Sequence, residues 1–261
     1  MNAFTERVNR LNPILSELLA AAGWTIYGSF FEWYWHKYWM HQPRFPKEAF
    51  RGHTIVHHGL YKGDDSYFVP ESEHPEHILL KPYALPAIVA IHLPIMYAIQ
   101  RYLAPNTMIG SVTAVILYFV IYEYMHWNMH VPRGHFVERF KFFQFLRMHH
   151  KLHHKYYQKN FCVLFPLADY VFGSAITEES VAQEKRLREE AIARGEKPGK
   201  FLAGSSRGRA SSRSRRSHRT DPQSRLAQEF MKFKMRRNRP GRRHRKIEDL
   251  ADIVAGRRKG E

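Results

Sequence analysis

The sequence predicts an all-α integral membrane protein with about three transmembrane helices, interfacial helices and a histidine-rich site at one membrane face. Apolar runs of about the ~20 residues that a spanning helix needs begin near residues 14, 85 and 107. Groups of histidines follow the first and the third run, and the chain after residue 177 is strongly basic. The mean hydropathy of -0.49 averages these unlike parts and therefore conceals the apolar one.

The first predicted span begins at Asn12-Pro13, a dipeptide typical of a helix start. The chain is mostly apolar from Ile14 to Trp35, and this run continues well past the small residues Ala20–Ala22. That continuation favours a spanning helix over a cleaved signal peptide. Several Trp and Tyr residues gather near the end of the run, as in the aromatic belt of a membrane interface.

Two further spans are predicted to form a membrane hairpin. Residues 36–61 leave the membrane, and the polar, Pro-rich residues 62–82 are predicted to be a loop. Leu85–Leu103 and Thr107–Met125 follow, joined by only three residues. An even number of crossings then separates the early histidines from the late ones, so all should emerge on one face. The basic residues after the first span and the basic tail place that face in the cytosol, in a bacterial inner membrane or the endoplasmic reticulum.

The last third of the chain is predicted to leave the membrane. His135–Lys151 alternates apolar and basic residues, which predicts an amphipathic helix at the interface. Thr177–Arg194 has a capping signal and the acid–base spacing of a solvated helix, and Gly204–Arg219 is predicted to be disordered. We therefore divide the chain into a membrane-embedded catalytic domain, 1–177, and a basic, largely disordered cytosolic tail, 178–261.

The tail carries most of the positive charge. Residues 178–261 hold 25 Lys and Arg against 12 Asp and Glu, which is +13 of the total of +17. Such charge is compatible with anionic lipid, RNA or an acidic redox partner. No recognition fold or pattern of stacking aromatic residues accompanies it, which argues against specific nucleic-acid binding. The single cysteine, Cys162, excludes an internal disulfide.

Histidines in four spaced groups are candidate metal ligands. Imidazole suits Fe, Zn, Cu and Ni, and ten histidines exceed the four ligands of a closed zinc site, so two metals fit better. Glu32 precedes His36 by four residues and Glu123 precedes His126 by three. Each carboxylate therefore either accepts a ring N–H or faces water at a helix end. The candidate ligands are His36, His41, His53, His57, His58, His126, His130, His150, His153 and His154, with His149 as a possible addition.

The spacing within the groups predicts which rings share a helix face. Residues four apart lie on one helix face, as expected for His126 with His130 and for His53 with His57. His58 lies beside His57. The three candidates of the last group cover an arc of roughly 100°. His149 stands four residues before His153 and could pair with it in the same way. The five-residue spacing of the first pair is about 140° round an α-helix, so that pair needs a helix end or a bulge to converge.

The first 174 residues resemble the fatty acid hydroxylase superfamily, also called the sterol desaturase family, of membrane di-iron oxygenases. The four histidine boxes follow that family's pattern, and Asn160–Ser174 is similar to its ending. The resemblance implies two iron ions, O2 and hydroxylation of a lipid (fatty acyl, sterol-like or another long apolar chain) by C–H abstraction and oxygen rebound. A desaturase or a carotenoid-type hydroxylase on the same scaffold is the alternative. An apolar substrate could enter sideways from the bilayer.

The chain departs from relatives in three ways. Three residues separate His53 from His57, where the lipid 2-hydroxylases usually have two, and the second box opens only twelve positions after His41. No His-Pro-Gly-Gly segment of a fused cytochrome b5 domain occurs. Electrons are therefore expected from a separate donor, such as ferredoxin or cytochrome b5 with NAD(P)H.

A membrane metal-binding or transport protein is the alternative from another class. Transport predicts polar ligands inside the spans, whereas most box histidines lie just past the span ends. His92 lies within an apolar run, where helix packing and substrate contact are both open.

Overall fold

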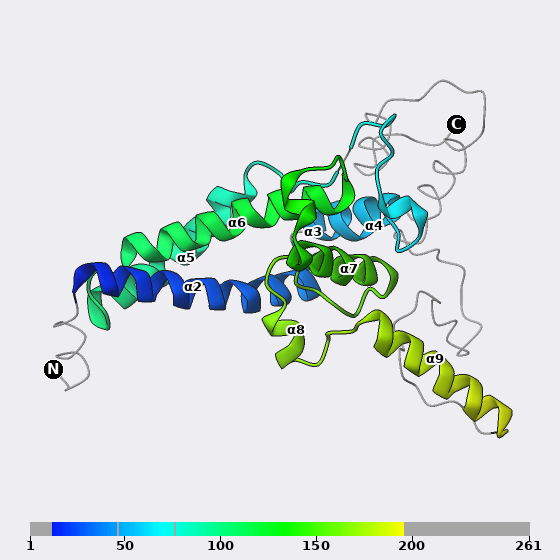
Figure 1. Cartoon of the computed structure of the whole chain (residues 1–261). Helices are drawn as coiled ribbons and strands as arrows, with labels where there is room; N and C mark the ends of the chain where they lie inside the picture. Colours follow the sequence, from blue (N-terminus) through cyan, green and yellow to red (C-terminus); the bar gives the residue numbers. More distant parts are fainter. Residues whose placement is uncertain (1–11, 46, 76, 196–261) are drawn as a thin grey trace, which may run out of the picture. The chain divides into compact units, whose positions relative to one another are not determined.

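The computed structural model describes residues 12–45, 47–75 and 77–195, and every regular element within these ranges is a helix (Figure 1). This confirms the all-α prediction. The long helices are α2 (Pro13–Trp35), α5 (Ala84–Tyr102) and α6 (Met108–His130). The shorter α-helices are α3 (Lys47–Phe50), α4 (His58–Leu60), α7 (Lys141–Lys155), α8 (Leu167–Val171) and α9 (Glu178–Ala193). The π-helices are η1 (His36–Met40) and η2 (Arg51–His57), and the 3-10 helices are η3 (Asp65–Tyr67) and η4 (Phe136–Arg139).

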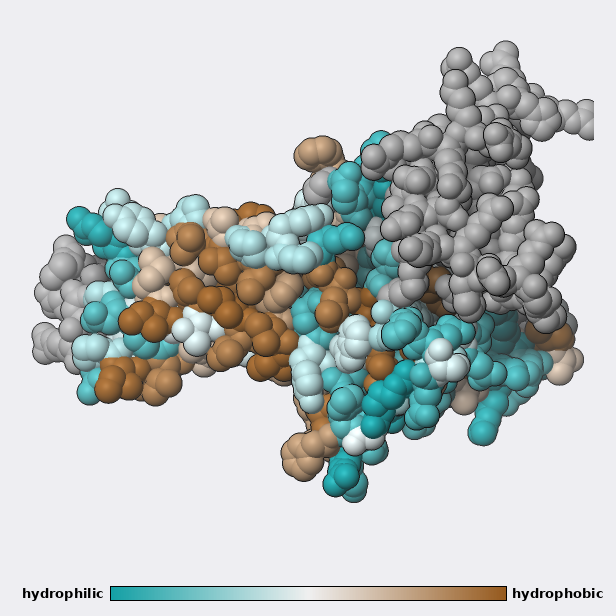
Figure 2. Space-filling view, turned by 90° about the horizontal axis from the view of Figure 1, so that it is seen from above, coloured by the Kyte–Doolittle hydropathy of each residue, from teal (hydrophilic) through white to brown (hydrophobic). Residues whose placement is uncertain are grey.

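Three helices of the described chain are long and apolar enough to cross a membrane: 13–40, 84–102 and 108–130. The first begins as predicted, because Asn12 Oδ1 accepts the backbone N–H of Ile14 at 2.9 Å and Pro13 occupies the first turn. Figure 2 shows apolar side chains gathered over this bundle and polar ones over the part that carries the histidines. Such an apolar exterior fits a helix bundle surrounded by lipid.

Helices α2 and α6 run parallel and approach each other closely. The backbone N–H of Gly110, in the first turn of α6, donates to Glu17 Oε2 at 2.6 Å. Further along, Gly28 of α2 lies against the ring of Tyr118. Because the two helices run in the same direction, their histidine-bearing ends emerge on the same side. Helix α5 returns antiparallel through the predicted hairpin, and all the histidine groups meet at one end of the helix bundle.

The predicted interfacial helix 135–151 is divided in two. Its first turn is the 3-10 helix η4, and α7 begins only after Phe140, whose backbone is extended. The cause is Glu138: its Oε1 accepts the backbone N–H groups of Arg133 and His135 at 3.0 and 2.9 Å, which ties this turn to the loop before it. Helix α7 is amphipathic as expected and leaves Phe142 and Phe145 exposed.

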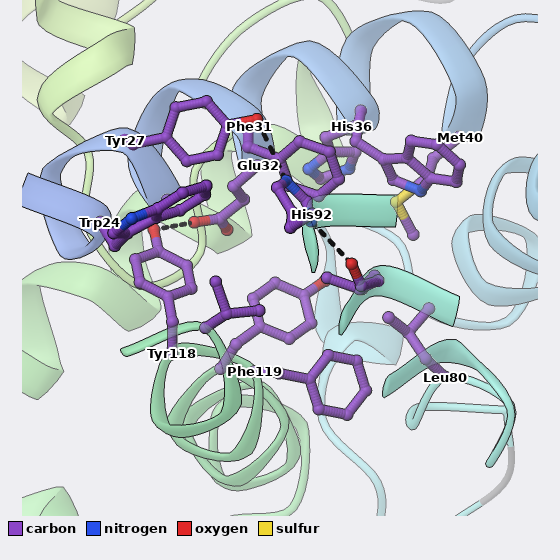
Figure 3. Close-up of a pocket in the computed structure, with 15 residues that line it drawn as sticks. Trp24, Tyr27, Phe31, Glu32, His36, Met40, Leu80, His92, Tyr118 and Phe119 are labelled. Carbon is purple, nitrogen blue, oxygen red and sulfur yellow. Dashed lines mark hydrogen bonds between the residues drawn. The ribbon is translucent and has the colours of Figure 1, made fainter. Parts of the chain in front are cut away.

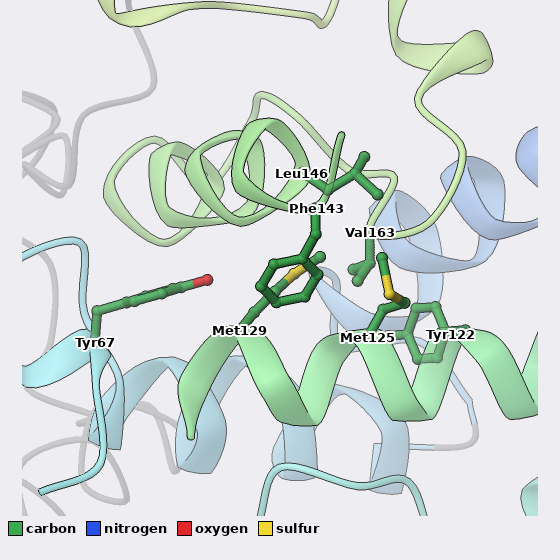
Figure 4. Packing of buried hydrophobic residues seen from close by; sticks show 7 residues of the cluster. All are labelled: Tyr67, Tyr122, Met125, Met129, Phe143, Leu146 and Val163. Atoms are coloured by element: carbon green, nitrogen blue, oxygen red, sulfur yellow. The ribbon is translucent and has the colours of Figure 1, made fainter. Parts of the chain in front are cut away.

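A buried apolar cluster joins α7 to α6 (Figure 4). Side chains of α6 and α7 interdigitate there, and Tyr67 of η3 and Val163 of a loop close the sides. Because α6 and α7 pack together through this cluster, the histidines at the end of α6 come to lie beside those of α7. The members are Tyr67, Tyr122, Met125, Met129, Phe143, Leu146 and Val163.

Helix α9 confirms the solvated helix that was predicted for residues 177–194. Thr177 caps it and forms a reciprocal capping box with Ser180, and none of its residues is buried. The predicted disorder of 204–219, and the remainder of the basic tail, lie outside the described residues.

The close contact between α2 and α6 predicts the effect of a small substitution. A Cβ at Gly110 would lie 2.0 Å from the backbone oxygen of Glu17, so Gly110→Ala must push the helices apart. We expect a loss of about 1–3 kcal/mol of stability, measured as a lower melting temperature in detergent. Gly23→Ala, whose Cβ meets nothing within 4 Å, is the matched control and should not destabilise the protein. Equal losses in the two variants would contradict this packing.

Candidate metal centre

The structure brings all ten candidate ligands together and divides them into two groups of five. Within each group the ligand nitrogens lie within 4.8 Å of one another. Their binding of metal stays a prediction. Group 1 consists of His36, His41, His53, His58 and His153, and group 2 of His57, His126, His130, His150 and His154.

In both groups the rings converge through their Nε2 atoms. In group 1, His53 Nε2 lies 2.7 Å from that of His36 and 3.0 Å from that of His58. In group 2, His150 Nε2 lies 3.2 Å from that of His130 and 3.0 Å from that of His154. Two nitrogens bound at right angles to one ion, each about 2.1 Å away, would be about 3.0 Å apart. The spacing therefore fits rings that share an ion.

The two early pairs converge because the chain is π-helical there. In η1 the backbone N–H of His41 donates to the carbonyl of His36 at 3.1 Å, and after η2 that of His58 donates to the carbonyl of His53. In a π-helix residues five apart are hydrogen-bonded neighbours, whereas an α-helix would place them about 140° apart. The bulge that the spacing of the first pair required is therefore present.

Because η2 is a π-helix, the pairing that was expected for the second box is wrong. His53 and His57 were predicted to share an α-helical face, but His53 and His58 belong to group 1 and His57 belongs to group 2. The last box divides in the same way. Its outer members, His150 and His154, are four apart on an α-helix and belong to group 2, whereas its middle member, His153, belongs to group 1. Each group thus combines two helical pairs with one histidine from the middle of a box.

Five of the rings are held from behind by backbone carbonyl groups. Their Nδ1–H donates to the carbonyl, which leaves the Nε2 lone pair free toward the group. A sixth ring, that of His41, has its Nδ1 3.4 Å from the Thr54 hydroxyl. The carbonyl contacts are His36 to Phe161, His57 to His77 at 3.0 Å, His130 to Tyr67 at 2.9 Å, His153 to Lys159 at 2.7 Å and His154 to Tyr61 at 2.6 Å.

Burial keeps these imidazoles neutral. It is the largest cause that lowers the pKa of His53, His57, His150 and His154 well below 6.5, and the neighbouring histidines lower it further. A neutral ring with Nε2 unprotonated is the form that binds a metal ion. Near neutral pH, the groups are therefore ready to bind metal without first losing protons.

The two carboxylates predicted to orient ring N–H groups have other partners. Glu32 accepts the Tyr118 hydroxyl at 2.7 Å and the backbone N–H of Val163, and Glu123 accepts the backbone N–H of Leu80 at 3.0 Å. Backbone carbonyls take the orienting role instead, as Phe161 does for His36. The carboxylates tie the loops of the site to the membrane helices.

His149 lies in neither group. Its Nε2 donates to Asp169 Oδ2 at 3.0 Å, and both side chains are buried. The same carboxylate accepts the N–H groups of Phe161 and Cys162 at 2.9 and 2.7 Å and the Ser174 hydroxyl at 2.7 Å. Burial alone would raise the pKa of Asp169, but these hydrogen bonds hold it below its ordinary value. Asp169 thus holds in place the segment whose carbonyl orients a ring of group 1.

Asn160 closes the other end of this segment. Its side-chain amide donates to the carbonyls of His149 and Ile176, both at 3.0 Å, and its oxygen accepts the N–H of Ile176 at 2.7 Å. The sequence pattern included both Asn160 and Asp169 but gave neither a role, because their partners are mostly backbone groups. The similarity of 160–174 to the family's ending was the signal available.

An apolar cavity lies between α2, α5 and α6 and reaches group 1 (Figure 3). Its volume is about 80 Å³, and most of its lining is aromatic. Of the ten candidate ligands, only His36 lines it. His92 also lines it, buried, and donates from Nδ1 to the carbonyl of Ile88 at 2.7 Å. The cavity therefore connects the interior of the membrane bundle to one histidine group.

The role of Asp169 predicts the effect of removing its charge. Asp169→Asn places an amide donor among four donors, so at least one buried hydrogen bond is lost and the variant should lose several kcal/mol of stability. Glu189→Gln, which removes a carboxylate from the exposed pair with Lys185, should change stability by less than about 0.5 kcal/mol. Melting temperatures in detergent compare the two. Equal values would show that the Asp169 network does not hold the segment.

The comparisons with known proteins agree with this geometry. A family model described as fatty acid hydroxylase matches residues 21–174, which include all ten histidines and the segment that Asp169 holds. No curated protein matched the chain. No solved structure matched it either. Because the match covers more than half of the sequence, the chain belongs to the fatty acid hydroxylase family.

Proposed function

We propose that this protein is an O2-dependent di-iron hydroxylase that acts on a long apolar lipid chain. The observation that carries the proposal is the narrow apolar cavity that leads from the membrane bundle to His36 in a histidine group. A chain in that cavity would have one carbon beside the group and the rest of its length among aromatic side chains. Desaturation on the same scaffold differs only in the product.

The donor set fits two iron ions. Imidazole nitrogen is a good ligand for iron, and two groups of five neutral rings would supply the ligands of two separate ions. When bound, two irons would supply the activation of O2 that oxidation of an unactivated C–H bond requires. The electrons are proposed to come from a separate protein, such as a ferredoxin or cytochrome b5.

The chain itself positions the substrate and excludes water. Phe31, Trp35 and Tyr122 line the cavity together with other aromatic residues, so a hydrocarbon chain loses contact with water along its length. Backbone carbonyls behind the rings fix the imidazoles before any substrate binds. The site would therefore need little rearrangement to hold one carbon in place.

The alternative of metal transport gains no support from this geometry. A conduction path would need polar or charged groups along the spans. The histidine groups lie instead at one end of the bundle, and the cavity that continues into it is lined mainly by apolar and aromatic side chains.

We also infer that the histidine groups face the cytosol. Arg44, Lys47 and Arg51 follow the first span on this side, and positive charge of this kind is typical of cytosolic loops. The basic tail, proposed to bind anionic lipid, would then meet the negatively charged leaflet.

The two-group arrangement predicts metal content. Detergent-purified protein, kept anaerobic and reconstituted with Fe(II), should hold about two irons per chain. His53→Ala removes a ligand of group 1 and His126→Ala one of group 2, so each should lower the iron content and the double variant should abolish stoichiometric iron. Iron per chain is measured by elemental analysis after removal of free metal.

His74→Ala is the control, because His74 is exposed in a loop and belongs to neither group. It should leave the iron content unchanged. If wild-type protein holds no stoichiometric metal, or if the double variant keeps it, the proposed centre is wrong.

The proposed reaction predicts incorporation of oxygen from O2. Iron-loaded protein given a reductant, ¹⁸O2 and long-chain lipids should form an alcohol that carries one ¹⁸O atom, detected by mass spectrometry. The His53→Ala and His126→Ala variants should lose at least about 100-fold of this turnover, because ligand loss removes the ion that activates O2. An alkene without ¹⁸O would identify a desaturase, and no oxidised product would exclude the proposed hydroxylation.

A further inference from the structure

The apolar cavity ends inside the membrane bundle at a wall of rings. Along α2 it extends from His36 back to Trp24, twelve residues, or roughly 18 Å at the helical rise of 1.5 Å per residue. One leaflet of a bilayer, half of the ~30 Å hydrocarbon core, is about 15 Å deep. The cavity is therefore about as long as the part of an acyl chain that lies within one leaflet.

A second cavity lies beyond the same wall. It has a volume of about 460 Å³, and it shares Trp24 and Tyr27 with the first cavity. Along α2 it continues to Ser16, another eight residues or roughly 12 Å. Among the residues that the structure describes, Trp24 and Tyr27 alone line both cavities, so they lie where the two cavities meet.

A hydrogen bond across two helices joins two of the rings in this wall. His92 of α5 donates from Nδ1 to the Ile88 carbonyl at 2.7 Å, so its Nε2 accepts the hydroxyl of Tyr27 at 3.1 Å (Figure 3). The rings also pack edge to face: the centroid of His92 lies 5.6 Å from that of Trp24 and 5.5 Å from that of Tyr27. The polar atoms of Tyr27 and His92 satisfy each other, so neither is left unpaired in this mainly apolar lining.

We propose that Trp24, Tyr27 and His92 form the floor of the substrate cavity and set the longest chain that the protein accepts. The occupant is an unbranched acyl chain, because the cavity is long, narrow and closely lined by rings. The methyl end of this chain lies against the floor, because the mainly apolar lining there would leave hydrogen-bonding atoms of a polar headgroup without partners. This inference rests on the proposed function, for which it names the residues that determine specificity.

The floor predicts a limit in chain length that moves when the wall is opened. Binding is measured on metal-free, detergent-purified protein by displacement of a fluorescent acyl probe with saturated fatty acids of increasing length. In the wild type, affinity should rise with length and then fall beyond a limiting chain. In Tyr27→Ala the two cavities join, so longer chains gain about fourfold in affinity for each further methylene buried.

Two controls isolate the effect of the ring. Tyr27→Phe keeps the ring and loses only the hydroxyl, so the limiting length should stay the same. Tyr97→Ala removes an exposed tyrosine of α5 that lines neither cavity, and it should also leave the limit unchanged. If Tyr27→Ala does not fold, Trp24→Ala opens the same wall from the neighbouring turn of α2.

The outcomes separate the floor from the proposed reaction, because binding needs no metal. A shift of the limiting length in the opened variant supports the floor even if no lipid is oxidised. An unchanged limit in a folded variant that binds short chains normally overturns the floor, even if the protein hydroxylates lipids. The absence of any limiting length in the wild type overturns it as well.

Discussion

The buried imidazole rings impose the constraint on which the rest of this structure depends. A buried polar atom without a partner destabilises a protein by about 1–3 kcal/mol, and here ten rings are brought together. The structure satisfies many of their Nδ1 atoms with backbone carbonyls and turns the Nε2 atoms toward two common points. The loops around the centre therefore follow paths that place carbonyls behind rings. Their conformation is part of the site.

The division into two groups follows from a change of helix type. An α-helix brings residues four apart together and a π-helix brings together residues five apart, and the chain uses the first for the late boxes and the second for the early ones. The additional residue between His53 and His57 is thereby accommodated, because the outer histidines of that box still share a face. The middle histidines of the second and the last box, His57 and His153, then join the opposite group, which interlocks the two groups.

Helix α2 connects the membrane bundle directly to the histidine groups. Helix α2 passes directly into η1, and Glu32 links it to Tyr118 of α6 and to the loop at Val163. The cavity follows this helix, so one element both carries His36 of group 1 and lines the cavity. A displacement of α2 would consequently move His36 and the lining of the cavity together.

The sequence by itself determined the parts that depend on composition and local spacing. Apolar length defined three helices long enough to span a membrane, their predicted number placed the histidines at one end of the bundle, and Asn12 and Thr177 marked helix starts. The assignment of rings to groups needed the tertiary structure, because a histidine pattern does not reveal whether its helix is α or π. The partners of Glu32, His149 and Asp169 also needed it, since these are backbone groups and side chains distant in the sequence. Hydropathy and periodicity are properties of a segment, whereas the pairing of buried polar atoms is decided by which segments meet.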